Sequence, residues 1–230
     1  MNTDLSTLEK KINITFKNKI LLKNVFIHRS YLNEHRSFEL PSNEKLEFLG
    51  DSVLSLSTSI YLYEEYPELT EGDYTDIKAS IVRTESLAEV SEKLDLGTYL
   101  YLSKGEEKGG GRTKTNIMAD CFEALIAAIF IDHDFDTAYA FINTYLFKEK
   151  LTYLIENKLY LSPKSRLQEI TQAKYKNLPA YEVINSTGPE HEKEFKVDVI
   201  INGKIVGSGS GKSKKQAEEN AAQNALEKIV

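Results

Sequence analysis

The first 150 residues place apolar side chains three and four positions apart, a spacing that predicts helices. Prolines and glycines interrupt this pattern at Pro41, Pro67, Gly72, Gly97 and the run at 109–111, where we expect helices to end. The predicted helices cover residues 5–12, 22–27, 46–63, 77–94, 117–131 and 138–146. This part of the chain is therefore expected to be all-helical.

After about residue 160 the spacing of apolar residues predicts both helices and strands. Pro163 opens a predicted helix over 163–172, and Asn202 with Gly203 is a strong hairpin signal. The other elements expected are strands at 181–184, 194–201 and 204–208 and a helix at 214–229. We therefore predict an all-α domain over residues 1–156, a linker over 157–162 and a small α+β domain (α-β-β-β-α) over 163–230.

Asp120 and Glu123 are the only charged residues between positions 117 and 131, inside a strongly apolar helix. A helix that is apolar nearly all round is buried. Burying a carboxylate is costly unless a positive charge meets it, and the helix offers no nearby Lys or Arg. A divalent metal ion is the obvious partner.

A second acidic group lies on the predicted helix over 46–63 and the residues just before it. Glu44, Glu47 and Asp51 share one helical arc. The residues on the opposite side are Leu46, Leu49, Val53, Leu56 and Ile60. Taken alone, the arc is equally consistent with a solvated acidic face. Together with Asp120 and Glu123 it would form an all-oxygen site for Mg²⁺ or Mn²⁺, of the kind that acts on phosphates.

Composition narrows the class of protein. The chain has 230 residues, 41% of them hydrophobic and 28% charged. No apolar run is long enough to span a membrane, and the N-terminal residues show no secretory signal, so we expect a cytoplasmic protein. The single cysteine, Cys121, rules out an internal disulfide framework and a multi-cysteine zinc site.

Charge is divided unevenly along the chain. Residues 1–159 hold 18 Lys and Arg against 26 Asp and Glu, whereas residues 160–230 hold 11 against 9. The acidity therefore belongs to the part with the candidate metal site, and the second part is mildly basic. This asymmetry suggests two domains with different roles.

The segment 209–217 combines glycines, a capping serine and lysines. We expect Gly209 and Gly211 to allow a tight turn into the last helix and Ser213 to cap that helix. Lys212, Lys214 and Lys215 would then gather at a helix N-terminus, which favours phosphate. A lysine pair alone is more often solvated surface.

Residues 43–54, NEKLEFLGDSVL, resemble the signature segment of ribonuclease III, and ADCFEAL at 119–125 and Glu71-Gly72-Asp73 fit the same family. The resemblance implies that Glu47, Asp51, Asp120 and Glu123 bind metal and that Glu44 and Glu71 lie in the catalytic valley. Lys45 stands where many members have Arg. The glycine run at 109–111 is expected to be a mobile surface loop, although the resemblance also allows it a minor contact with the RNA backbone.

Residues 163–230 resemble the double-stranded RNA-binding domain, through Gly188-Pro189-Glu190-His191 and the segment 209–217. The resemblance implies that Ser165, Gln168, Glu169, Gln172 and His191 reach successive minor grooves, where recognition is mostly by shape.

The function implied is a Mg²⁺-dependent endoribonuclease, with Mn²⁺ able to substitute, that cuts double-stranded RNA to 5′-phosphate and 3′-hydroxyl ends in rRNA, mRNA or small RNA processing. It would act as a homodimer, since one acid cluster cuts one strand. The alternative is a catalytically silent double-stranded RNA-binding or ribosome-associated protein.

Overall fold

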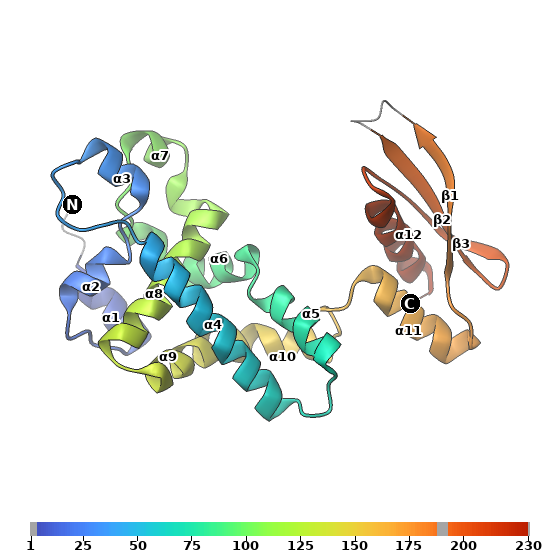
Figure 1. Ribbon diagram of the computed structural model, residues 1–230, viewed down its shortest axis with the longest axis horizontal. Helices are drawn as coiled ribbons and strands as arrows, with labels where there is room; N and C mark the ends of the chain where they lie inside the picture. The colour runs from blue at the N-terminus through green and yellow to red at the C-terminus, as the bar shows by residue number, and fades with distance from the viewer. Residues whose placement is uncertain (1–3, 188–192, 230) are drawn as a thin grey trace. The chain divides into compact units, whose positions relative to one another are not determined.

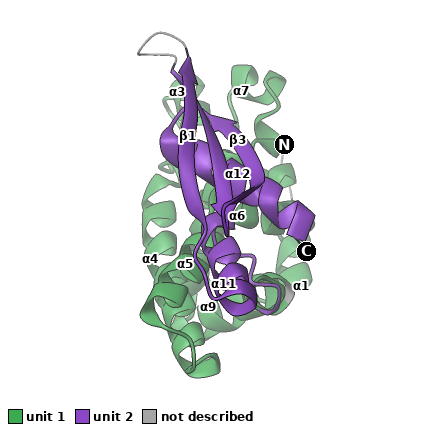
Figure 2. Cartoon of the chain, turned by 90° about the vertical axis from the view of Figure 1, so that its right-hand side faces the viewer, with its two compact units in different colours: residues 1–155 green, residues 156–230 purple. Residues whose placement is uncertain are grey.

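The computed structural model describes residues 4–187 and 193–229. The chain forms two compact units that divide between Ile155 and Glu156 (Figures 1 and 2). The first unit is helical and the second combines helices with one sheet. The predicted order of an all-helical part followed by an α-β-β-β-α part is therefore confirmed.

The first unit is built around α8 (Thr115–Asp132), against which α4 (Glu44–Glu65) and α6 (Thr84–Lys93) pack. The apolar residues of α8 from Ile117 to Ile129 are buried, as its sequence predicts. The remaining helical segments are α1 (Ser6–Ile12), α2 (Lys19–Asn24), α3 (Arg29–Glu34), α5 (Glu71–Ile81), η1 (Leu96–Tyr99), α7 (Lys104–Lys108), η2 (Gly111–Thr113), α9 (Phe135–Ile142), the π-helical η3 (Asn143–Leu151) and α10 (Thr152–Glu156).

The single helix expected over 77–94 is wrong. It is two helices, α5 and α6, because the backbone of Arg83 is extended and starts a new helix. Gly72 does not end a helix either, since it is the second residue of α5. Thr70 and Asp73 form a capping box that fixes the start of α5 at Glu71.

Two further expectations for this unit need correction. Leu56, placed with the apolar side of its helix, is 53% exposed. The buried stripe of α4 instead runs through small residues such as Gly50 and Ser57, because α8 passes close to them. The expected surface loop at the glycine run is correct only for Gly109 and Gly110, which form an exposed turn, whereas Gly111 is buried at the start of η2. Next to it, Arg112 donates to the carbonyl of Gly97 (2.7 Å) and to Glu107 (2.8 Å).

The second unit contains α11 (Pro163–Tyr175), β1 (Ala180–Thr187), β2 (Glu194–Ile201), β3 (Lys204–Gly211) and α12 (Lys214–Ile229). The three strands form one antiparallel sheet in the order β1-β2-β3. Asn202 and Gly203 both have positive φ, at 51° and 74°, as the predicted two-residue hairpin requires. The core combines Leu167 of α11, alternate residues of β2 and the alanines of α12.

Gly209 and Gly211 do not form the tight turn expected from the sequence, because both lie in β3. They permit a close approach instead. A Cβ at Gly209 would lie 2.2 Å from the backbone nitrogen of Ala221, and one at Gly211 would lie 2.7 Å from that of Ala217. With Gly207, which faces Ala225 in the same way, they bring β3 directly against α12.

Candidate active site and RNA-binding surface

The candidate active site lies where α4 crosses α8. The start of α4 is fixed by Asn43, whose buried side-chain amide donates to the carbonyl of Val25 (3.0 Å). The backbone N–H of Asn43 also donates to the carbonyl of Ile27 (2.9 Å). Further along, Gly50 brings the backbone of α4 against that of Glu123 in α8. The two hydrogen bonds of Asn43 hold the start of α4, and the close approach at Gly50 sets the distance at which the acids of α4 meet those of α8.

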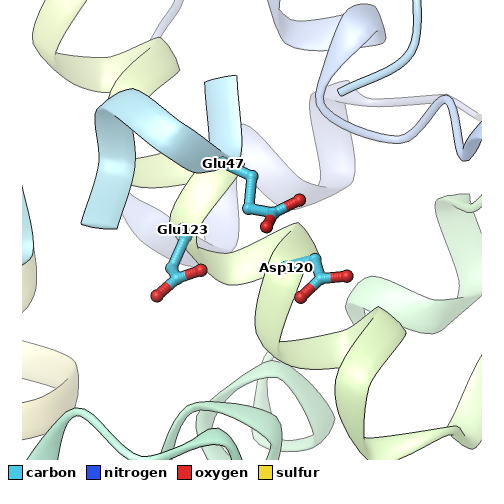
Figure 3. Close-up of side chains that lie close together, drawn as sticks. All are labelled: Glu47, Asp120 and Glu123. Atoms are coloured by element: carbon cyan, nitrogen blue, oxygen red, sulfur yellow. The ribbon is translucent and has the colours of Figure 1, made fainter. Parts of the chain in front are cut away.

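Three acidic side chains come together at this crossing (Figure 3). Glu47 of α4 and Asp120 and Glu123 of α8 each offer a carboxylate oxygen, and these oxygens all lie within 4.8 Å of one another. All three side chains are half-buried. We call these residues the three-carboxylate cluster. Such a donor set fits a hard divalent cation.

The other three predicted acids lie outside this cluster, and Glu71 is not brought near it, because Tyr74 of the same helix donates to the carbonyl of Tyr66 (2.8 Å) at the other end of α4. Asp51 lies on the exposed side of α4, yet its charge acts on Glu123. Glu44 begins α4 and accepts a hydrogen bond from the Ser42 hydroxyl (2.6 Å). Glu71, the first residue of α5, is exposed, and the Thr75 hydroxyl donates to it at 3.3 Å. The structure thus joins three of the six predicted acids in one cluster.

The carboxyl groups of the cluster repel one another. Burial is the main reason that the pKa of the Glu123 carboxyl rises to about 8. The negative charges of Asp51, Glu47 and Asp120 act in the same direction. Burial also raises the pKa of Asp120, and burial together with the charge of Asp120 raises that of Glu47. Without a cation, the cluster therefore holds protons at pH values where carboxyl groups are usually ionised.

Arg29, the first residue of α3, is a cation near the cluster that sequence reasoning missed. Its guanidinium lies 3.6 Å from a Glu44 carboxylate oxygen. It also opposes the effect of burial on the pKa of Asp120 and of Glu47. No local signal marks it, because the sequence does not show that the start of α3 meets the start of α4.

The predicted RNA-binding residues of α11 differ in their exposure. Gln168, Glu169 and Gln172 are exposed, whereas Ser165 is partly covered. Ser162 caps the helix by accepting from the backbone N–H of Ser165 (3.1 Å). The Glu169 carboxylate pairs with Lys158 at 2.6 Å.

The lysines at the start of α12 are exposed. Ser213 caps this helix as predicted, accepting from the backbone N–H of Gln216 at 3.2 Å. Lys212, Lys214 and Lys215 form no ion pair with a described residue. They remain available to an anionic partner. His191 and its neighbours in the 188–191 motif lie outside the described residues.

Comparison with known proteins settles the family. Residues 18–150 match the model of the Ribonuclease-III-like family, and residues 163–229 match the double-stranded RNA binding motif. A protein of Listeria monocytogenes named Ribonuclease 3 is 43% identical over 97% of this chain and 96% of its own length. The chain belongs to the ribonuclease III family. The protein named Ribonuclease 3 in Oceanobacillus iheyensis is 42% identical over 98% of both chains.

Ribonuclease III proteins are endoribonucleases, so the predicted enzyme class and the resemblance are confirmed. The solved nuclease domain of ribonuclease III from Campylobacter jejuni covers 64% of this chain with a TM-score of 0.59 and 33% identity. The match takes in 99% of that domain.

The nuclease domain of the ribonuclease III family is metal-dependent, which agrees with a cluster of three carboxylates that could hold an ion. The second unit carries the double-stranded RNA binding motif, so double-stranded RNA is a partner of this chain, as predicted. No helix among the described residues is long and apolar enough to cross a membrane.

Proposed function

We propose that this protein is a Mg²⁺-dependent endoribonuclease that cuts both strands of double-stranded RNA and leaves 5′-phosphate and 3′-hydroxyl ends. The three-carboxylate cluster carries the proposal. Its oxygens lie within 4.8 Å of one another on half-buried side chains. Without a cation, the ionised carboxylates would repel one another.

The residues present fit Mg²⁺ better than a softer metal. Glu47, Asp120 and Glu123 supply only oxygen ligands, which hard cations prefer. The pKa of Glu123, raised by burial and by the neighbouring carboxylates, supports a cation of some kind at this place, because a bound cation would offset those negative charges. Mn²⁺ has similar ligand preferences and is expected to substitute. When bound, the ion supplies a nucleophilic water at neutral pH and offsets negative charge on the leaving oxygen.

The side chains around the cluster have separate tasks in this proposal. Glu47, Asp51, Asp120 and Glu123 would hold the ion; Asp51 lies outside the three-carboxylate cluster, but its charge reaches Glu123. Glu44, in the first turn of α4, and Glu71, in the first turn of α5, would belong to the catalytic valley as the family resemblance implies, with Glu71 lying at the other end of α4 from the three-carboxylate cluster.

RNA binding falls mainly to the second unit. Ser165, Gln168, Glu169 and Gln172 of α11 would contact the minor groove of an A-form duplex, where 2′-hydroxyl groups are exposed. Lys212, Lys214 and Lys215 would neutralise backbone phosphates.

A homodimer would supply one cluster for each strand, and twofold pairs are the commonest oligomers. The exposed apolar side chains of α4 support this arrangement, since Phe48 is 79% exposed and Tyr63 is 75% exposed. The Campylobacter jejuni structure is described as showing flexibility in a region involved in dimer formation of its nuclease domain. Cytoplasmic location remains our expectation for the protein.

The decisive experiment replaces one ligand without changing its size. Glu123→Gln should lower cleavage of a long RNA duplex in Mg²⁺ by orders of magnitude, whereas binding in Ca²⁺ should stay near wild type. Glu68→Gln, at an exposed acid with no predicted role in the site, is the matched control and should cut normally.

Near-normal cutting by Glu123→Gln would overturn the site assignment. If the wild-type chain binds the duplex but never cuts it with Mg²⁺ or Mn²⁺, the chain is instead a silent double-stranded RNA-binding protein.

A further inference from the structure

The backbone around Arg29 is held firmly beside the start of α4. The N–H of His28 donates to the carbonyl of Tyr101 (3.2 Å), and the Ser30 hydroxyl accepts from the N–H of Ser103 (3.1 Å). Ile27, just before them, accepts from the N–H of Asn43. Arg29 is thus anchored on both sides, and one of these anchors also positions the first turn of α4.

The guanidinium of Arg29 is far less constrained than its backbone. Its side chain is 73% exposed, and its one ion pair with a described residue is the 3.6 Å contact with Glu44. That distance is longer than a hydrogen bond. The charge of Arg29 also reaches Glu106, but that carboxylate is already paired with Lys114 at 2.5 Å. The guanidinium therefore has unused donors within electrostatic reach of the metal cluster.

A bound metal ion and RNA would change the role of the Arg29 guanidinium. In the absence of metal, Arg29 partly offsets the charges of Glu44, Glu47 and Asp120. A divalent ion on the cluster would take over that task, and RNA would bring phosphates to the same place. A guanidinium presents a planar fork of donors that matches phosphate.

We infer that Arg29 is an RNA-binding residue of the nuclease unit, which exchanges its contact with Glu44 for a backbone phosphate beside the scissile one. This inference rests on the proposed function, because it takes the three-carboxylate cluster as the place of cleavage. It assigns one phosphate contact to a unit whose net charge is otherwise acidic.

The test uses the full chain and a defined RNA duplex. Arg29→Ala should raise KM by about tenfold, the effect expected for removing one charge-assisted hydrogen bond. Its kcat should change little, because a contact made in both the ground state and the transition state acts mainly on KM. In Ca²⁺, the slope of the logarithm of the binding constant against the logarithm of the salt concentration should become shallower by roughly 0.9, the increment for one neutralised phosphate.

Two further variants separate a phosphate contact from loss of charge or of structure. Arg29→Lys keeps a positive charge and should retain the wild-type salt dependence with a smaller rise in KM. Arg36→Ala removes an exposed arginine shortly after α3 and should leave KM at the wild-type value.

The competing role is that Arg29 only neutralises Glu44. In that case Arg29→Ala would have no effect on KM in a Glu44→Gln background, and the Mg²⁺ concentration needed for half-maximal rate would fall. That result, or an unchanged salt dependence, would overturn the inference. Failure of the proposed function is distinguishable, since wild-type protein would then bind the duplex in Ca²⁺ without cutting it in Mg²⁺.

Discussion

Gly50 of α4 lies so close to Glu123 of α8 that a Cβ at position 50 would stand 1.9 Å from the Glu123 carbonyl oxygen. Because the helices touch at this point, side chains on either side of Gly50 meet those of α8. Gly50→Ala should therefore push the helices apart, with a decrease of about 1–3 kcal/mol or more in the free energy of unfolding. Cleavage should fall sharply, since the carboxylates would separate.

The matched control is Gly105→Ala, also in a helix, where a Cβ would meet nothing closer than 4.0 Å. Thermal unfolding and cleavage rates measured on both variants check this prediction. Equal melting temperatures for Gly50→Ala and wild type would show that the crossing has more room than the structure indicates.

Stability should depend on pH through Glu123. Its pKa is about 8 in the folded chain, against an ordinary value of 4.5. Between these values the folded state holds a proton that the unfolded chain has released, so the stability that this group contributes is highest below about 4.5 and falls as pH rises towards 8. Mg²⁺, if it binds the ionised folded form as proposed, should reverse this decrease.

Melting temperatures measured from pH 4.5 to 8.5, with a chelator or with excess Mg²⁺, test this linkage. Glu123→Gln cannot ionise and should lose less stability across that range, and it should gain less from Mg²⁺. If the melting temperatures of wild type and Glu123→Gln respond alike to pH and to Mg²⁺, Glu123 is not the group whose pKa is raised in the folded chain.

The contributions of the two domains to RNA binding and to cleavage can be distinguished by their dependence on salt concentration. Lys214→Ala combined with Lys215→Ala should weaken duplex binding and flatten its salt dependence by roughly 0.9 for each phosphate that is no longer neutralised. Cleavage should fall at physiological salt and recover at low salt, because the three-carboxylate cluster is untouched. Binding isotherms at several salt concentrations provide the measurement, and Lys204→Ala, elsewhere on the same unit, is the control.

Association should depend on the exposed apolar side chains of α4. Phe48→Ser should raise the dissociation constant of the proposed dimer by at least about tenfold, since burying an aromatic side chain stabilises an interface by roughly 1.5–3 kcal/mol. Light scattering at micromolar concentration would then report a mass near that of one chain, 26.1 kDa. Ile205→Ser removes another exposed apolar residue, from β3, and should leave association unchanged.

The buried acids of α8 could be predicted from sequence because nothing else explains two carboxylates in an apolar helix. The elements of the second unit were also predictable, since strand alternation, Asn202-Gly203 and the Ser213 cap are local signals. A helix break that depends on the backbone conformation of one residue, such as the break at Arg83, could not be predicted from sequence.

What escaped prediction depends on contacts between distant segments. The role of Gly50 becomes visible only when α8 is in place, and Arg29 reaches Glu44 only because the start of α3 is tied to Tyr101 and Ser103. The face of α4 that carries Leu56 was misread for the same reason. An amphipathic pattern does not reveal which side a neighbouring helix covers.

The glycine-lined contact between β3 and α12 has a consequence for how this protein can change over time. Because Gly207 and Gly209 meet the backbone of α12 directly, main-chain atoms set how closely that helix approaches the strand at these two positions. A single methyl group added on that face of β3 would displace the helix that carries Lys214 and Lys215, the residues proposed to bind phosphate, so these glycines are expected to stay unchanged while other positions of the sheet vary.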